Sequence, residues 1–192
     1  MQKLQGKIAR TVQSLNNKQV RQITPSNNDY WEKRKTLDYY KKVIKLAKKH
    51  SPEAQSVIDV GTHISQTITR LDWIPDKTAI DLKHLPEIPG ARNIQCDFMT
   101  FKPEQRYDLV LCLQVLEHLD CPELFTDKLL KIGKKVIISV PYKWPEGQCQ
   151  YHVQDPVDED KLLSWTHKSW IEMAIAHDRA KRMVAVFDGS LS

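Results

Sequence analysis

Two aspartates and one glycine have the spacing of a site that holds a ribose-bearing cofactor. Val57–Val60 is a short apolar run typical of a buried strand, and the chain turns directly after it at Gly61. Asp59 lies in this run, and Asp81 lies about 20 positions further on, at the end of a second apolar run. A carboxylate there can accept hydrogen bonds from both ribose hydroxyls, while glycine lets the backbone approach the ligand. Alternatively, Asp81 only caps the turn.

The turn lacks the glycines of a dinucleotide-binding loop. A G-x-G-x-x-G loop supplies the close backbone donors that a pyrophosphate needs, and His63 and Ser65 occupy the positions of its further glycines here. This change weakens the case for a nicotinamide cofactor more than the case for a sulfonium amino acid. The spacing of Asp59, Gly61 and Asp81 thus fits S-adenosyl-L-methionine and, less well, a nicotinamide cofactor.

A second group of reactive side chains lies in segment 142–165, which is rich in proline, aromatic and acidic residues. Tyr142 and His152 are its candidate catalytic groups, and its composition suits a polar acceptor such as a sugar, a phenol or an amine. His152 with Asp155 could act as a base and its orienting group, or as metal ligands. Acidic clusters are also commonly solvated surface. The four cysteines show no C-x-x-C spacing, and we predict no metal.

Strands and helices alternate along most of the chain. Apolar runs predict strands at Val57–Val60, Thr78–Leu82, Asn93–Phe98, Asp108–Leu113, Val136–Val140 and Arg182–Phe187. Helical spacing predicts helices over Asp29–His50, through Ile64, Ile68 and Leu71, from Pro122 to Ile132, and over Thr166–His177. This alternation predicts an α/β fold with a doubly wound, mostly parallel sheet and helices on both faces.

Charge divides the chain unevenly. Residues 1–50 hold 13 Lys and Arg against 3 Asp and Glu, a net charge of +10. The whole chain has a net charge of +5, so the remaining 142 residues have a net charge of −5. We predict a polar, basic N-terminal arm over residues 1–28 and one domain over residues 29–192. The arm could bind nucleic acid or another acidic partner, or the lysines could form a solvated helix face. No apolar run suggests a membrane span or signal peptide, so we expect a cytoplasmic protein.

The run from Tyr107 to Leu119, YDLVLCLQVLEHL, is the most specific motif of the chain. It resembles the fourth-strand motif of class I S-adenosylmethionine-dependent methyltransferases, and with the other strand motifs the resemblance covers residues 30–142. It implies a Rossmann-like, three-layer fold with a seven-stranded sheet, preceded here by a helical N-terminal extension. The place of the Asn/Asp-Pro-Pro-Tyr/Phe run of nucleobase-amine methyltransferases holds Leu113-Gln114-Val115-Leu116 instead.

The resemblance implies a role for each matching position. The residues that it places around the cofactor are Asp59, Gly61, Thr62, His63, Asp81, Leu82, Asp97, Phe98, Leu113 and Gln114. The first three would line the methionine end, and His63 would either bond its carboxylate or remain an exposed loop residue. Asp81 would hold the ribose, with Leu82, Asp97 and Phe98 around the adenine. A backbone carbonyl of Leu113 or Gln114 would meet the amino group.

We predict a methyltransferase that modifies an oxygen or nitrogen atom of a small polar molecule, with His118, His152 and Tyr142 as candidate catalytic residues. His118 would either serve as a general base or brace the loop after the fourth strand. Two alternatives remain open: a non-catalytic Rossmann-like binding domain, and an RNA-modifying methyltransferase that uses the basic arm. Nucleic acid is not the partner we expect. The short segment after the fifth strand predicts either a large acceptor or a homodimer that closes the site.

Overall fold

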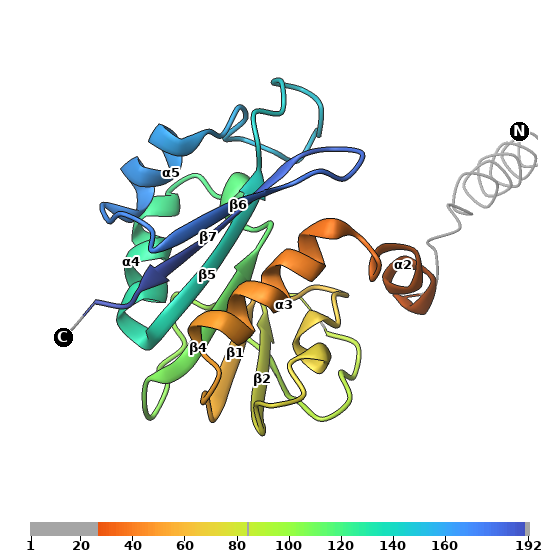
Figure 1. The fold of residues 1–192 in the computed structure, drawn as a ribbon, viewed down its shortest axis with the longest axis vertical. Coiled ribbons are helices and arrows are strands. Elements are labelled where there is room, and N and C mark those ends of the chain that lie inside the picture. The colour runs from red at the N-terminus through yellow and green to blue at the C-terminus, as the bar shows by residue number, and fades with distance from the viewer. Residues whose placement is uncertain (1–26, 84, 191–192) are drawn as a thin grey trace, which may run out of the picture.

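The computed structural model describes residues 27–83 and 85–190, and its centre is a sheet of seven strands (Figure 1). The strands are β1 (Ser56–Val60), β2 (Asp76–Asp81), β3 (Arg92–Gln95), β4 (Tyr107–Leu113), β5 (Gly133–Pro141), β6 (Glu172–Ala176) and β7 (Arg182–Asp188). They lie in the order β3-β2-β1-β4-β5-β7-β6. The first five are parallel, whereas β7 pairs antiparallel with both β5 and β6. The predicted doubly wound, mostly parallel sheet is confirmed.

Alternating residues of the central strands fill two separate cores. Leu109 and Leu111 of β4 belong to one core, while Val110 and Cys112 belong to the other, because successive side chains of a strand point to opposite faces. Helix α3 (Asp38–His50) covers the first core, and helices α4 (Pro122–Ile132) and α5 (Glu159–Thr166) cover the second (Figure 1). Helices therefore lie on both faces, as the sequence predicts.

The predicted single helix over Asp29–His50 is wrong. The structure has two helices here, α2 (Asn27–Arg34) and α3, with a break at residues 35–37. Leu37 is extended and provides no side-chain cap for α3. The cap comes instead from Asp178, whose carboxylate accepts hydrogen bonds from the backbone N–H groups of Asp38 and Tyr39 at 2.7 and 3.1 Å. A distant residue thus fixes where α3 begins.

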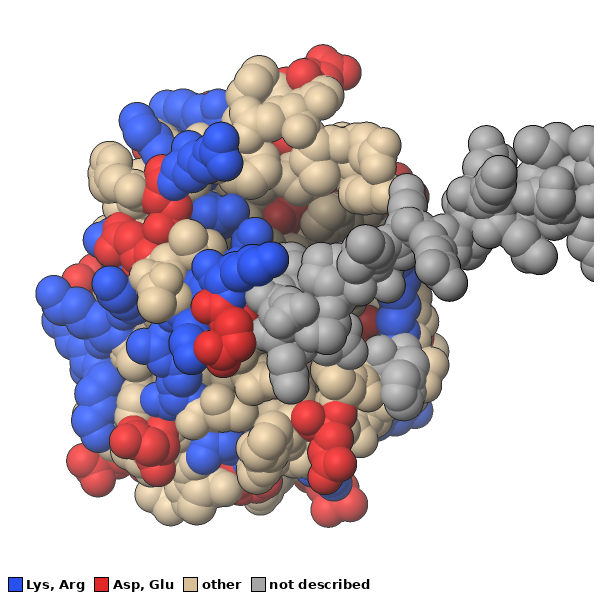
Figure 2. Space-filling model, turned by 90° about the vertical axis from the view of Figure 1, so that its right-hand side faces the viewer, with Lys and Arg blue, Asp and Glu red and all other residues tan. Residues whose placement is uncertain are grey.

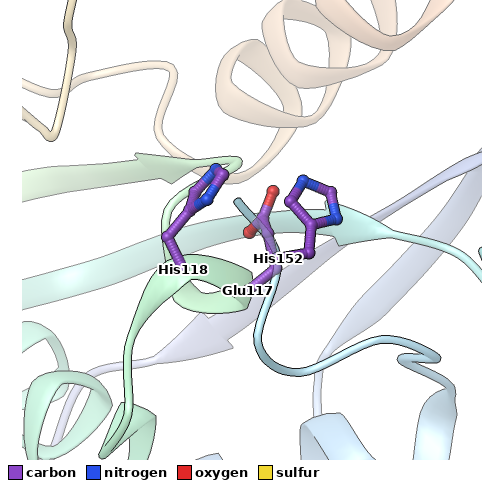
Figure 3. A group of neighbouring side chains, drawn as sticks. All are labelled: Glu117, His118 and His152. Carbon is purple, nitrogen blue, oxygen red and sulfur yellow. The ribbon is translucent and has the colours of Figure 1, made fainter. Parts of the chain in front are cut away.

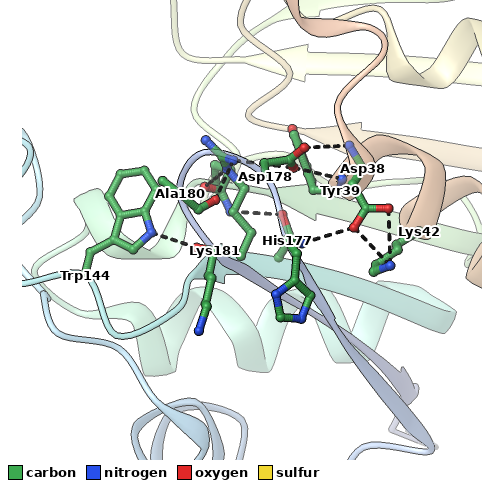
Figure 4. Close-up of polar contacts among 11 residues, drawn as sticks. Asp38, Tyr39, Lys42, Trp144, His177, Asp178, Ala180 and Lys181 are labelled. Atoms are coloured by element: carbon green, nitrogen blue, oxygen red, sulfur yellow. Dashed lines mark hydrogen bonds and ion pairs between the residues drawn. The ribbon is translucent and has the colours of Figure 1, made fainter.

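The start of α3 exchanges hydrogen bonds with residues 177 and 178 of the β6–β7 hairpin (Figure 4). While Asp178 caps α3, the Asp38 carboxylate accepts from the backbone N–H of His177 at 3.0 Å. Arg182 of β7 lies 3.7 Å from Asp178 and donates to the carbonyl of Ala180. The start of α3 and the turn of the hairpin are therefore one hydrogen-bonded assembly.

Two further helix predictions are wrong. The stripe Ile64, Ile68 and Leu71 forms only a short 3-10 helix, η1 (Thr67–Arg70). The hydroxyl groups of Ser65 and Thr67 bond to each other, and the Ser65 hydroxyl also accepts from the backbone N–H of Thr67. The Thr69 hydroxyl donates to the carbonyl of Gln66, and such local bonds compete with regular helical bonding.

The predicted helix over Thr166–His177 is largely a strand. Residues Glu172–Ala176 form β6, which pairs with β7 along Glu172↔Val186 to Ala176↔Arg182. Conversely, the aperiodic segment 142–165 contains most of α5, whose first turn is capped by Asp158 accepting from the backbone N–H of Lys161 at 3.0 Å.

The lysines of α3 form a solvated helix face. Lys41, Lys45, Lys48 and Lys49 are exposed, opposite the buried Val43, Leu46 and Ala47, and Figure 2 shows basic side chains gathered along one side of the molecule. The predicted arm of residues 1–28 lies almost entirely outside the described residues. Among the described helices, none is long and apolar enough to cross a membrane.

Candidate active site

The turn after β1 packs against the segment that follows β4. Gly61 has φ +74°, a conformation that side-chain-bearing residues rarely adopt, and a Cβ atom there would lie 2.5 Å from Cγ2 of Val115. Its N–H donates to the carbonyl of Ile80 at 2.8 Å, so the turn also lies against the end of β2. Glycine is thus required by close packing as well as by φ.

Asp59 is a buried carboxyl group, and only one of its two oxygens has a hydrogen-bond partner among the described residues. Its Oδ2 accepts from the hydroxyl of Thr62 at 2.8 Å, whereas its Oδ1 has no hydrogen-bond partner among the described residues. Burial raises the pKa of Asp59 to about 7, and the negative charge of Asp81 adds to this rise. An unpaired buried oxygen is costly, so the site is suited to receive a cationic or N–H donor group.

Asp81 organises the edge of the site beside the turn. Its Oδ2 accepts from the backbone N–H of His63 at 2.9 Å, and its Oδ1 accepts from that of Lys83 at 2.8 Å. The predicted capping role is therefore present. Because each carboxylate oxygen can accept more than one hydrogen bond, capacity for ribose hydroxyls remains. His63 itself has φ +48° and is exposed.

Exposed apolar side chains lie near the ends of β2 and β3. Leu82 is 69% exposed and Met99 is 43% exposed. Asp97 accepts from the backbone N–H of Met99 at 2.8 Å, while Phe98 is buried and its ring centroid lies 4.7 Å from that of Phe125. The sequence analysis predicted Phe98 as the aromatic neighbour of adenine and did not consider Met99, which lies two positions after Asp97.

The end of β4 is held by Gln114 and Arg182. Gln114 has φ +61°, its side chain donates to Ser139 at 3.2 Å, and it accepts from Nε of Arg182 at 3.1 Å. Arg182 is buried and its guanidinium lies 5.2 Å from the ring centre of Tyr39 and 5.4 Å from that of Trp144. Sequence reasoning missed Arg182, because only the fold brings the start of β7 to Gln114. Leu113 ends β4 and is buried.

The structure brings together His118 and His152, which the sequence singled out separately, and adds Glu117 to them (Figure 3). One ligand atom of each of the three side chains lies within 4.8 Å of the others. Glu117 and His118 belong to the 3-10 helix η2 (Leu116–His118), directly after β4. His152 comes from the loop after β5, which is tied to η2 by a 2.9 Å hydrogen bond from the N–H of Val153 to the carbonyl of Glu117.

Both histidine rings are oriented through Nδ1. His118 Nδ1 lies 2.9 Å from the carbonyl of Tyr151, and His152 Nδ1 lies 2.7 Å from the carboxylate of Asp155. The two rings meet edge to face with centroids 4.8 Å apart, and His152 also stacks on Trp144 at 5.5 Å. Burial lowers the pKa of His118, which favours its neutral ring.

Glu117 is fully buried, and neither of its carboxyl oxygens has a hydrogen-bond partner among the described residues. Burial raises the pKa of Glu117 to about 8, with a further rise from Asp155. Glu117 lies within the VLEHL run of the sequence. The sequence alone could not predict its burial or its unpaired oxygens, because both depend on the packing of η2.

Tyr142 is engaged elsewhere. Its hydroxyl donates to the carboxylate of Glu159 at the start of α5, at 2.7 Å, and Lys143 lies over its ring. This arrangement connects the end of β5 to α5. It gives Tyr142 a structural partner, while His118 and His152 contact each other on the segments that follow β4 and β5.

Known structures share this architecture, although no family model matches the chain and no curated sequence matches it. The Burkholderia thailandensis 1,6-didemethyltoxoflavin-N1-methyltransferase superposes with a TM-score of 0.68 at 16% identity, covering 96% of this chain and 90% of that one. The chain has the fold of class I S-adenosylmethionine-dependent methyltransferases. The methyltransferase fold recurs in N-methyltransferase NodS from Bradyrhizobium japonicum, with a TM-score of 0.64, 13% identity and coverage of 80% and 86%.

A third methyltransferase of this fold is the magnesium protoporphyrin IX methyltransferase of Synechocystis, with a TM-score of 0.59, 13% identity and coverage of 79% of this chain and 82% of that one. All three relatives named here were crystallised with S-adenosylhomocysteine. The predicted seven-stranded class I fold is thereby confirmed.

Proposed function

We propose that this protein is an S-adenosylmethionine-dependent methyltransferase that acts on an oxygen or nitrogen atom of a small polar molecule. The observation that carries the proposal is the pairing of Asp59 and Asp81 around the Gly61 turn, on the methyltransferase fold. In open α/β sheets, ligands bind outside the carboxyl ends of the strands where the strand order reverses. Here that point lies between β1 and β4.

The cofactor's groups match the groups that the site offers. The unpartnered oxygen of Asp59 suits the cationic amino group of the methionine portion. Asp81 suits the ribose hydroxyls, and the exposed Leu82 and Met99 offer apolar surface to the adenine. This assignment retains the predicted roles of these aspartates and adds Met99 to them.

Methyl transfer from a sulfonium requires chiefly that the acceptor atom be held in line with the methyl group. The segment that carries Glu117 and His118 begins at Val115, which touches the Gly61 turn. The acceptor therefore binds beside the histidine pair in this proposal, with the loop after β5 as its other wall. Figure 2 shows a hollow in the surface of the molecule, with atoms of acidic residues visible inside it.

Calorimetric titration with S-adenosylhomocysteine tests the cofactor site. Wild-type protein should bind, and Asp81→Ala should weaken binding at least 10-fold, because a hydrogen bond to a charged group contributes about 1.5–3 kcal/mol. Asp76→Ala is the matched control, since Asp76 is exposed at the opposite end of the same strand. Absence of wild-type binding would overturn the proposal.

Transfer itself is tested with methyl-labelled cofactor and cell extract. Label in the small-molecule fraction supports the proposal. Label in RNA would instead favour the RNA-modifying alternative, and binding without any labelled product would favour the non-catalytic one.

A further inference from the structure

We propose that Glu117, His118 and His152 bind a divalent transition-metal ion, which holds the methyl acceptor through oxygen. The metal site stands on its own geometry, whereas its role toward the acceptor rests on the proposed methyl transfer. The proposal revises the sequence-based expectation that no metal is bound.

The first argument is the protonation pattern of the two histidines. The carbonyl of Tyr151 can only accept a hydrogen bond, so Nδ1 of His118 carries the proton. The Asp155 carboxylate likewise places a proton on Nδ1 of His152. With the Nδ1 protons fixed in this way, Nε2 is the nitrogen of each ring that can offer a lone pair to a metal ion. Metal-binding histidines commonly have this arrangement, with the other nitrogen donating to a carbonyl or carboxylate that fixes the ring.

The second argument is the state of Glu117. Its side chain is completely buried, and both of its oxygens are unpartnered within the described part of the chain. A buried carboxyl group with no partner is energetically costly, whereas a bound cation would compensate it directly. Figure 3 shows its carboxyl group lying between the two imidazole rings.

The third argument is distance and access. The candidate ligand atoms lie within 4.8 Å of one another, and metal bonds of about 2.1 Å would bring them to about 3.4 Å apart in a tetrahedral site. Rotations of three side chains can supply that movement of about 1.4 Å or less. His118 is exposed, so the side of the site that faces solvent is open to further ligands.

The ligand set indicates the metal and the acceptor. Two imidazoles and one carboxylate suit Mn²⁺, Fe²⁺, Co²⁺ or Zn²⁺ better than Mg²⁺ or Ca²⁺, which prefer oxygen ligands. A metal with open positions binds a hydroxyl oxygen and lowers the pKa of that hydroxyl. The hydroxyl proton would pass to water, the oxygen would form a bond to the methyl carbon, and the electron pair of the broken carbon–sulfur bond would return to sulfur. The proposal therefore limits the methyl acceptor to molecules that present a hydroxyl oxygen to the metal ion.

Direct titration of the chelator-treated full chain with Co²⁺ or Mn²⁺ tests the site. Calorimetry should show one ion per chain, and Co²⁺ should develop a visible absorption band. Glu117→Gln, His118→Ala and His152→Ala should each weaken binding at least 10-fold. His50→Ala is the control. Nε2 of His50 also lies 2.7 Å from a glutamate carboxylate, that of Glu172, but His50 is the last residue of α3 and does not belong to the group of Glu117, His118 and His152.

The outcomes separate this proposal from the proposed function. Wild-type protein that binds S-adenosylhomocysteine but neither metal ion would overturn the metal site alone. The proposal is also overturned where the three variants bind metal as wild type does, or where His50→Ala weakens binding equally. Thermal unfolding of each variant checks folding, and since His118 is exposed, His118→Ala provides a variant that keeps the core intact.

Discussion

Replacing Gly61 by alanine should destabilise the protein by two additive effects. Alanine at φ +74° costs about 1–2 kcal/mol in the left-handed region. Its methyl group would also lie 2.5 Å from Cγ2 and 3.3 Å from Cγ1 of Val115, and overpacking of this kind costs about 1–3 kcal/mol. We therefore expect Gly61→Ala to lower the free energy of unfolding by about 2–5 kcal/mol.

Gly90 offers a matched control. It has φ +72°, but a Cβ atom there would meet nothing within 4 Å, so Gly90→Ala should cost only the conformational part, about 1–2 kcal/mol. Urea denaturation of both variants measures the difference. Adding Val115→Ala to Gly61→Ala removes both close methyl groups, and a double-mutant cycle should return a favourable coupling of about 1–3 kcal/mol.

Two results would refute this reasoning. One is a Gly61→Ala variant that loses no more stability than Gly90→Ala. The other is a coupling of zero between positions 61 and 115, which would mean that the turn and the segment after β4 are not packed as described.

Two further variants test the charges. Burial raises the pKa of Asp59 to about 7 from its ordinary value of 3.8, so between these pH values the folded chain keeps a proton that the unfolded chain releases, and stability falls as pH rises. Asp59→Asn should flatten this slope by up to about 1.4 kcal/mol per pH unit, and equal slopes in urea denaturation would contradict it. Asp178→Ala should cost about 2 kcal/mol by uncapping α3, against about 0–1 kcal/mol for the exposed Asp188→Ala, which breaks an ion pair with Lys135.

The sequence predicted the central sheet well because its signals are local. The central parallel strands β1, β4 and β5 are buried on both faces, so they appear as mainly apolar runs, and Gly61 follows the first while Pro141 ends the third. Their positions followed from these runs to within a few residues. The alternation of strands and helices then restricted the fold to few choices.

The errors occurred where distant residues decide the structure. Trp170, Ile171, Ala174 and Ile175 have helical spacing, but β7 offers this segment an edge for antiparallel pairing, and the pairing prevails. The break before α3 depends on Asp178, which lies 140 positions away.

The same distinction between local signals and distant contacts applies to the residues of the candidate site. Asp59, Gly61 and Asp81 could be found from spacing, because the turn that they form is local in the chain and in space. Glu117 could not be assigned a role, since its significance depends on burial and on His152, which a separate loop delivers. The cofactor roles of the ten predicted residues remain predictions for the binding experiments above.

The exchange of hydrogen bonds between the start of α3 and residues 177 and 178 has a consequence for the order of folding. These hydrogen bonds close a loop of 139 to 140 positions, which makes them among the least local contacts of the chain. Closing a long loop is entropically costly until other contacts have shortened it, so the sheet must largely assemble first. The exchange thus belongs to the late side of the folding barrier. Its loss would leave the folding rate nearly unchanged and accelerate unfolding.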